Sequence, residues 1–232
     1  MRSLKRCSPR PRSARSGRYP DMAISAKDIS AAIARIQAGI EPVERRLNAA
    51  DSRLGDGDTG TMLARLIGVM SSQSPDPSAS VGAYLSQLAK AAARSTGSSF
   101  GTLIIAALMA TGRETKERDS IAVDDVADLL GVARREMTAR SGTGEGSKTV
   151  IDSLARLEAE TRGAGSRADL AQRALAAVDA ALDDFRDLPC RVGRARIHEA
   201  SSIGHDDPGM LAVALLVRAA AGPKAAADTD IE

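Results

Sequence analysis

Three aspartates crowd into one glycine-rich turn early in the chain. The segment LNAADSRLGDGDTGTMLARL, residues 47–66, holds Asp51, Asp56 and Asp58 within eight positions. Carboxylates this close repel one another unless a positive charge lies among them. Hard divalent cations take such oxygen ligands, and Mg²⁺ characteristically joins carboxylates to phosphates. The turn therefore predicts a magnesium and phosphate site; the alternative is a solvated Asp-Gly loop with ordinary helix caps, since both are common turn residues.

The residues after the turn could add groups for the same phosphate. An apolar helical pattern begins near Gly60, and the start of a helix offers free N–H groups to anions. Thr59 and Thr61 add hydroxyls. The turn does not predict an EF-hand, because the glutamate at the twelfth loop position is missing.

Three further loops combine glycine with hydroxyl or charged residues: 95–102, 141–149 and 193–209. The segment SGTGEGSKT does not meet the spacing of a phosphate-binding P-loop, because Ser147 precedes Lys148 and no strand comes before it. Lys148 either reaches a phosphate or lies on a solvated helix start. Arg194 could hold a phosphate with two parallel hydrogen bonds.

Helices must position these loops, and helical periodicity dominates the chain. One apolar stripe is formed by Ile29, Ile33, Ile36, Ile40, Val43 and Leu47. Ser25 and Asp28 predict a capping box at the start of this helix, and Gly39 and Pro42 are positions where it would kink. Further helices are predicted at 61–71, 79–94, 101–111, 123–140, from 148, 167–187 and 209–220.

No segment has a convincing period of two, so we predict one all-α domain of about eight helices over residues 23–222. In an antiparallel bundle, alternate loops lie at the same end. Glycine-rich loops that each open a helix would therefore meet around one ligand.

Bulk composition excludes several classes of protein. The net charge of the 232 residues is only +2, with both signs mixed, which gives no footprint for nucleic acid or a membrane surface. The two cysteines do not predict a disulfide framework, and no apolar run is long enough to cross a membrane. We expect a cytoplasmic protein. An alanine-rich core with few aromatics favours close-packed helices over strands.

The two ends of the chain differ from the rest. Residues 1–22 are rich in Arg, Ser and Pro and are interpreted as a disordered basic extension. A targeting or nucleic-acid arm is one alternative; another is that translation starts at Met22, because MAISAKDIS leads directly into a helix start. Residues 223–232 are predicted to be a flexible tail.

Taken in this order, the motifs resemble the nucleotide-binding L-type subunit, or C-terminal domain, of dihydroxyacetone kinases. The turn DSRLGDGDTG resembles the family's D-x-x-x-G-D-G-D-H/T-G block. The segment GEGSKTVIDSL is similar to G-x-G-D-K-T-M-x-D-x-L, and GRARIHEASSIGHDDPG to G-R-A-S-Y-x-G-E-R-S-x-G-H-x-D-P-G. The resemblance covers roughly residues 25–222.

This resemblance implies an antiparallel eight-helix barrel with a nucleotide held by loops at one end. It implies that Asp51, Asp56 and Asp58 coordinate two Mg²⁺ ions and, with Arg194, form the catalytic set. The positions it implies for contacts with ADP or ATP are Thr59, Gly60, Thr61, Met62, Ser98, Ser99, Gly142, Val150, Arg194, Asp207, Pro208 and Gly209.

The implied activity is phosphoryl transfer to an alcohol group of a ketose, a triose or tetrulose, held by a partner K-type subunit. The phosphate source is either exchangeable ATP or a permanently held ADP that a phosphotransferase-system protein rephosphorylates. The alternative function is a non-catalytic ADP-binding regulator of a transcription factor or a partner kinase subunit. Met62 replaces a usual asparagine, Ser147 a usual aspartate, and Phe100 enlarges its loop. The sugar and the oligomeric state stay open.

Overall fold

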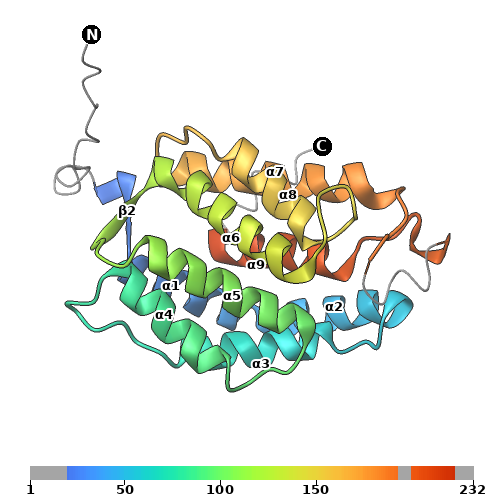
Figure 1. Ribbon diagram of the computed structural model, residues 1–232, viewed down its shortest axis with the longest axis horizontal. Helices are drawn as coiled ribbons and strands as arrows, with labels where there is room; N and C mark the ends of the chain where they lie inside the picture. Colours follow the sequence, from blue (N-terminus) through green and yellow to red (C-terminus); the bar gives the residue numbers. More distant parts are fainter. Residues whose placement is uncertain (1–19, 193–199, 223–232) are drawn as a thin grey trace, which may run out of the picture.

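The computed structural model describes residues 20–192 and 200–222 and is almost entirely helical (Figure 1). This confirms the predicted all-α class. The helices are α1 Ala26–Ala38, α2 Ile40–Leu54, α3 Thr59–Ser71, α4 Val81–Ala92, α5 Ser99–Glu114, α6 Val126–Ser141, α7 Val150–Glu160, α8 Arg167–Arg186 and α9 Pro208–Ala221. Short 3-10 turns occur at Pro20–Met22, Val123–Asp125 and Ala200–Ser202.

The first predicted helix is two helices, α1 and α2, divided at Gly39. The predicted capping box opens α1: the Ser25 hydroxyl accepts from the Asp28 amide, and the Asp28 carboxylate accepts from the Ser25 amide. The amide of Gly39 ends α1 by donating to the carbonyls of Arg35 and Ile36. Pro42 lies in the first turn of α2, where its missing N–H needs no partner. This division explains why the described residues hold nine α-helices rather than about eight.

Two three-residue strands were not predicted. β1 Ala23–Ser25 pairs antiparallel with β2 Ser120–Ala122, with Ile24 opposite Ile121. Such short strands give no readable period of two. They fasten the start of α1 to the connection between α5 and α6.

Neighbouring helices in the chain pack side by side from α2 to α9, and α9 also contacts α1, α2 and α7. The last helix therefore lies centrally in the bundle (Figure 1). It is the most apolar helix and buries Met210, Leu211 and Ala212 almost completely. The eight-helix barrel that the resemblance implies stays a prediction.

The α2–α3, α4–α5 and α6–α7 connections, together with the end of α8 and the start of α9, lie at one end of the bundle, the right-hand end in Figure 1. These are the connections that carry the glycine-rich motifs. The fold therefore places the predicted loops at one end, as expected for antiparallel neighbours.

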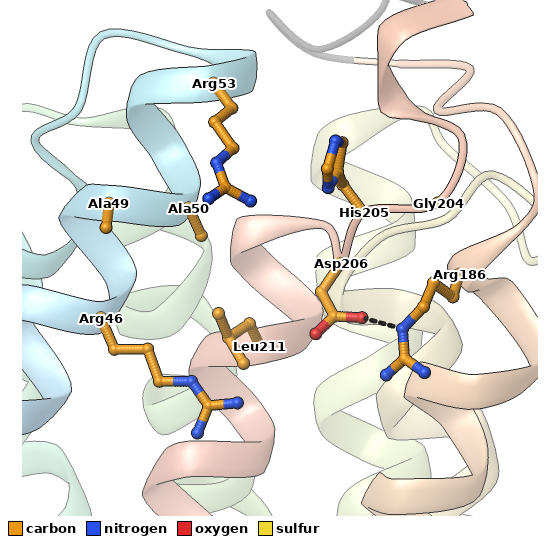
Figure 2. A pocket seen from close by; sticks show the side chains of 9 residues that line it. All are labelled: Arg46, Ala49, Ala50, Arg53, Arg186, Gly204, His205, Asp206 and Leu211. Atoms are coloured by element: carbon orange, nitrogen blue, oxygen red, sulfur yellow. Dashed lines mark hydrogen bonds and ion pairs between the residues drawn. The ribbon is translucent and has the colours of Figure 1, made fainter.

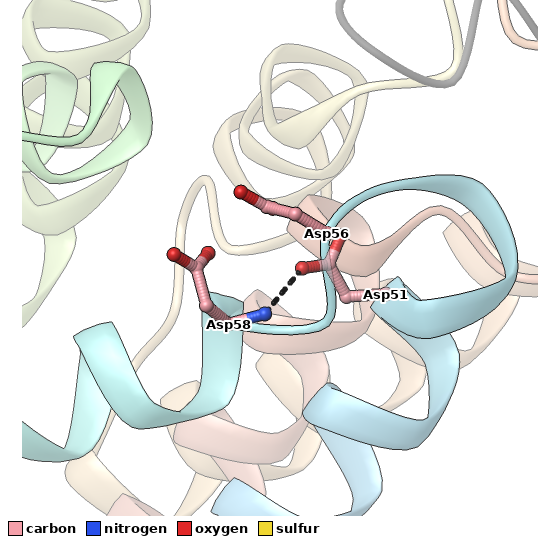
Figure 3. A group of neighbouring side chains, drawn as sticks. All are labelled: Asp51, Asp56 and Asp58. Carbon is pink, nitrogen blue, oxygen red and sulfur yellow. Dashed lines mark hydrogen bonds between the residues drawn. The ribbon is translucent and has the colours of Figure 1, made fainter.

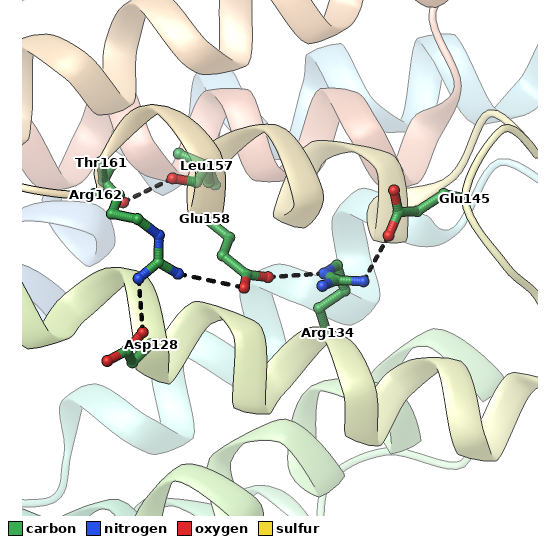
Figure 4. A network of polar contacts seen from close by, with 7 residues as sticks. All are labelled: Asp128, Arg134, Glu145, Leu157, Glu158, Thr161 and Arg162. Carbon is green, nitrogen blue, oxygen red and sulfur yellow. Dashed lines mark hydrogen bonds and ion pairs between the residues drawn. The ribbon is translucent and has the colours of Figure 1, made fainter.

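A network of ion pairs joins α6 and α7 along their length (Figure 4). Arg134 contacts Glu158 at 2.9 Å and Glu145 at 2.5 Å, which fastens the α6–α7 connection to both helices. Arg162 contacts Asp128 at 2.9 Å and Glu158 at 3.6 Å. Partly exposed pairs stabilise only modestly, so the network mainly sets the register of the two helices.

Candidate functional site

The structure brings the three predicted carboxylates together in the α2–α3 turn (Figure 3). One oxygen from each of Asp51, Asp56 and Asp58 lies within 4.8 Å of the others. Asp51, in the last turn of α2, is only 6% exposed, whereas the other two are exposed. Its Oδ2 accepts hydrogen bonds from the amides of Asp58 at 3.0 Å and Thr59 at 3.1 Å. Asp51 therefore holds the turn that presents the other two carboxylates.

The chemistry of this donor set fits a hard divalent cation. Asp51 and Asp58 form no ion pair with any residue in the described ranges. Three carboxylates at such separations repel one another strongly unless a cation lies between them. Oxygen-only ligands with exposed neighbours suit Mg²⁺, which keeps several of its waters.

Two glycines make the turn sterically possible. Gly57 has a φ of +79°, a conformation that side chains rarely adopt, and a Cβ there would lie 2.5 Å from the Ser52 hydroxyl. A Cβ on Gly60 would lie 2.7 Å from Oδ1 of Asn48 and still nearer to the carbonyl of Glu44. The start of α3 therefore rests directly on α2, which sets the separation of the aspartates.

At the start of α3, most of the groups that were predicted to donate hydrogen bonds to a phosphate already have acceptors within the chain. The Thr59 amide already donates to Asp51, and the Thr61 amide donates to Oδ1 of Asn48 at 3.1 Å. The Thr61 hydroxyl donates to Glu44 at 2.8 Å. Among these first amides, only that of Gly60 has no acceptor in the part of the chain that the structure describes.

Sequence reasoning missed the supporting roles of Glu44 and Asn48. Their signal is a polar i, i+4 pair one turn before Asp51 on the same helix. The pair became meaningful only once α3 was found to start against it.

The loop before α5 is a helix cap. The Ser98 hydroxyl accepts from the Gly101 amide at 2.9 Å, and Ser99 is the exposed first residue of α5. Two departures from the family pattern serve packing: Met62 and Phe100 are partly buried against the core. Met62 therefore packs on apolar neighbours, at a position where the resemblance to dihydroxyacetone kinases implies an asparagine.

The starts of α7 and α9 meet. Gly142 ends α6 in the left-handed conformation, at a φ of +67°, and is exposed. The amide nitrogen of Val150, the first residue of α7, lies 3.6 Å from where a Cβ on Gly209 would be. Asp207 caps α9 by accepting from the Met210 amide at 2.9 Å, with Pro208 at the first helical position. The predicted turn-then-helix signature is confirmed.

Asp207 has an unusual electrostatic environment. Burial raises its pKa to about 6, although the Met210 and Gly209 amides and the Lys148 charge act in the opposite direction. A carboxyl group perturbed by burial next to a set of loops is a feature of functional sites.

Both predicted roles of Lys148 are wrong. The side chain is only 1% exposed, and its ammonium donates to the carbonyls of Arg186 at 2.9 Å, Leu188 at 2.7 Å and Ser202 at 2.8 Å. An ammonium has three donors, and all three are used, so none remains for a phosphate. Burial lowers the pKa of Lys148. The lysine fastens the start of α7 to both ends of the 187–202 segment.

Some predictions fall on residues outside the described ranges. Arg194 and its phosphate contact belong to these, as do the predictions for residues 1–19 and 223–232. Within the described part of the chain, no helix is both long and apolar enough to span a bilayer.

Comparisons with known proteins agree on one family. A family model described as the DAK2 domain matches residues 53–222, beginning two residues after Asp51. The human protein named triokinase/FMN cyclase is 28% identical over 202 residues, covering 84% of this chain and 35% of its own length. The bovine protein of that name is 27% identical over 184 residues, covering 76% and 31%. The chain thus spans about a third of these relatives.

Solved structures show the same fold. The native dihydroxyacetone kinase of C. freundii matches with a TM-score of 0.61 and 20% identity, over 99% of this chain and 39% of that one. The same kinase in complex with AMP-PNP and Mg²⁺ matches with a TM-score of 0.64, also at 20% identity, over 98% and 38%. At this identity the likeness concerns the fold alone.

Proposed function

The chain belongs to the DAK2 domain family, and from that premise we propose that it is the phosphoryl-transfer subunit of a dihydroxyacetone-type kinase. The observation that carries the proposal is the gathering of Asp51, Asp56 and Asp58 within 4.8 Å at the loop end of the bundle. The names of the relatives, triokinase and dihydroxyacetone kinase, support kinase chemistry. The complex of the C. freundii enzyme with AMP-PNP and Mg²⁺ supports a magnesium-bound nucleotide.

In this proposal the three aspartates hold two Mg²⁺ ions against the phosphates of ADP or ATP. When bound, the ions supply charge neutralisation at the transferring phosphoryl group. Asp51 fixes the turn through its hydrogen bonds with the amides of Asp58 and Thr59, so the carboxylates need little rearrangement on binding. The unpaired Gly60 amide donates to a phosphate oxygen.

The remaining loops bind the nucleotide. We assign its contacts to Thr59, Gly60, Thr61, Met62, Ser98, Ser99, Gly142, Val150, Arg194 and Asp207–Gly209. For Thr61 and Ser98 the contact has to come beside the hydrogen bonds that these residues already make within the chain. Arg194 supplies a bidentate donor to the phosphates.

Asp207, the carboxyl group whose pKa is raised, already caps α9 by accepting from the Met210 amide, so we assign it to the nucleotide and not to a base for a sugar hydroxyl. This fits a subunit that delivers phosphate while a partner K-type subunit holds a triose or tetrulose. The donor is either exchangeable ATP or an ADP that stays bound and is rephosphorylated by a phosphotransferase-system protein. We propose a cytoplasmic location.

A second candidate is a non-catalytic ADP-binding regulator of a transcription factor or a partner kinase subunit. The partly buried Met62, which packs against the core, and Ser147, at a usual aspartate position, favour it. In that case nucleotide binds but no phosphate is transferred.

Calorimetric titration with Mg–ADP tests the site. Asp58→Asn keeps the shape of the side chain but removes a ligand charge, so we expect affinity to fall by about tenfold to a hundredfold. Asp124→Asn, an equal charge change on an exposed residue in the Val123–Asp125 turn, is the matched control and should bind like the parent. If Asp58→Asn bound Mg–ADP as tightly as Asp124→Asn does, the proposed site would be wrong.

Turnover separates the two functions. The parent chain is mixed with a K-type subunit and dihydroxyacetone, and either ATP or a phosphorylated phosphotransferase-system protein is supplied. Sugar phosphate formed with one donor supports the kinase and identifies the donor. Tight Mg–ADP binding without product under either donor supports the regulator.

A further inference from the structure

A second polar site lies outside the acidic turn, in a pocket of about 360 Å³ between α2 and the start of α9. Figure 2 shows its lining. The α2 wall is formed by Arg46, Ala49, Ala50 and Arg53, which share one face of the helix at i, i+3, i+4 and i+7. The two alanines leave room between the arginines, and the volume is within the range of small-molecule sites.

The pocket and the acidic turn use different faces of α2. The buried face of that helix carries Val43, Leu47, Asp51 and Leu54. Arg46 and Arg53 are exposed and line the pocket instead, with the Arg53 guanidinium beside Ala50 and the Arg46 guanidinium below Leu211 in the view of Figure 2. A ligand between these arginines is therefore separate from an ion held by Asp51.

The charges that line the pocket are unbalanced. Across from α2, the Arg186 guanidinium already contacts Asp206 at 3.1 Å and Asp183 at 2.9 Å, so its charge is compensated. Arg46 and Arg53 have no hydrogen bond or ion pair with any residue that the structure describes. Two uncompensated positive charges thus face one cavity.

The spacing and the hydrogen-bond geometry of Arg46 and Arg53 favour a phosphate group as the ligand. The arginines are seven residues apart, about 10 Å along the helix axis, so their long side chains can reach one anion from two sides. Guanidinium groups match the oxygens of phosphate with paired hydrogen bonds. His205 adds an imidazole donor, and Leu211 gives an apolar floor for a short carbon chain.

We propose that this pocket binds a small phosphate monoester. The inference does not depend on the proposed kinase activity. The pocket adjoins both parts of the candidate nucleotide site: Arg53 lies two residues after Asp51, and His205 lies two residues before Asp207. A phosphate ester bound here contacts both segments.

Binding is measured by calorimetry in about 0.15 M salt, which screens weak attraction between exposed charges. The probes are glycerol 3-phosphate and inorganic phosphate, with glycerol as the neutral control. We expect saturable binding of glycerol 3-phosphate and none of glycerol. The double variant Arg46→Gln, Arg53→Gln should weaken binding by about a hundredfold, because two charged donors are lost. Arg65→Gln, on an exposed part of α3, is the control for loss of a single positive charge outside the pocket and should bind like the parent.

Mg–ADP titration of the same variants separates this site from the nucleotide site. We expect the double variant to bind Mg–ADP without added phosphate ester as the parent does, even if Asp58→Asn shows that the proposed function fails. The proposal would be overturned if Arg65→Gln lost as much affinity for glycerol 3-phosphate as the double variant. That result would show that binding depends on the overall charge of the protein and not on the pocket. Absence of binding to the parent would also overturn it, as would binding of an acidic peptide in place of both phosphate probes.

Discussion

At position 60, the absence of a side chain decides how the acidic turn is built. A methyl group there would meet the Glu44 carbonyl and the Asn48 amide oxygen, both on α2. The start of α3 would have to move away from α2, and Asp58, which directly precedes α3, would move with it. The geometry of the carboxylates therefore depends on a residue that does not itself ligate.

Gly60→Ala tests this dependence. We expect the free energy of unfolding to fall by about 1–3 kcal/mol, the usual range for overpacking, and Mg–ADP binding to weaken as well. Urea denaturation and calorimetry are the measurements. Gly68→Ala in the same helix is the control, because its nearest neighbour would be 3.7 Å away; it should be neutral or stabilise by up to about 1 kcal/mol. An unchanged urea midpoint for Gly60→Ala would contradict the close approach.

At the scale of elements, Lys148 connects three of them. Its ammonium donates to the carbonyl of Arg186 at the end of α8, to that of Leu188 just after this helix, and to that of Ser202 in the Ala200–Ser202 turn. Lys148 also has a φ of +59°, which is uncommon for a residue with a side chain. The backbone tolerates this conformation because three hydrogen bonds hold the side chain in place.

Lys148→Met keeps the length of the side chain and removes the donors. Three buried carbonyls lose their partner, while the burial of a charge is relieved, so we expect a net destabilisation of about 2–4 kcal/mol. Hydrogen exchange should also speed up at the amides of Arg191 and Gly204, which bond across the same region. Lys90→Met, on an exposed lysine of α4, is the control. Slow exchange at both amides in Lys148→Met would show that the lysine does not hold this segment.

At the scale of the whole molecule, one ion pair joins helices that are far apart in the chain. Arg167 at the start of α8 contacts both carboxylate oxygens of Asp28 in α1, at 2.6 and 2.9 Å, and also the carbonyl of Ala23. Burial opposes ionisation of Asp28, but hydrogen bonds from Arg167 and Ser25 outweigh it and lower its pKa to about 2.

This shift predicts part of the acid sensitivity of the fold. The folded state favours the ionised form of Asp28. Its contribution to the free energy of unfolding is therefore complete above pH 3.8 and is lost as the pH falls through a pKa of about 2. We expect Asp28→Asn to remove about 1–2 kcal/mol of that pH dependence, a value reduced for partial exposure. Unfolding by urea at several pH values between 2 and 5 measures it. Arg167→Gln should remove most of the same slope; if it leaves the slope unchanged, the pair is not its source.

The sequence by itself determined most of the helices, several of their caps and the three carboxylates that gather in the acidic turn. Ser25 with Asp28, and Asp207 with Pro208, act on neighbours within four residues, so their effect can be read from local order. The three aspartates are close in the chain, and a short turn leaves them little freedom to separate.

Only the tertiary structure decided which groups are already used. Lys148 bonds to residues 38 to 54 positions away, and Asn48 occupies the Thr61 amide across the helix interface. The pocket beside Arg46 exists only because α9 returns to α2. Such pairings depend on how the helices pack, and side-chain types at distant positions carry no local signal of that packing.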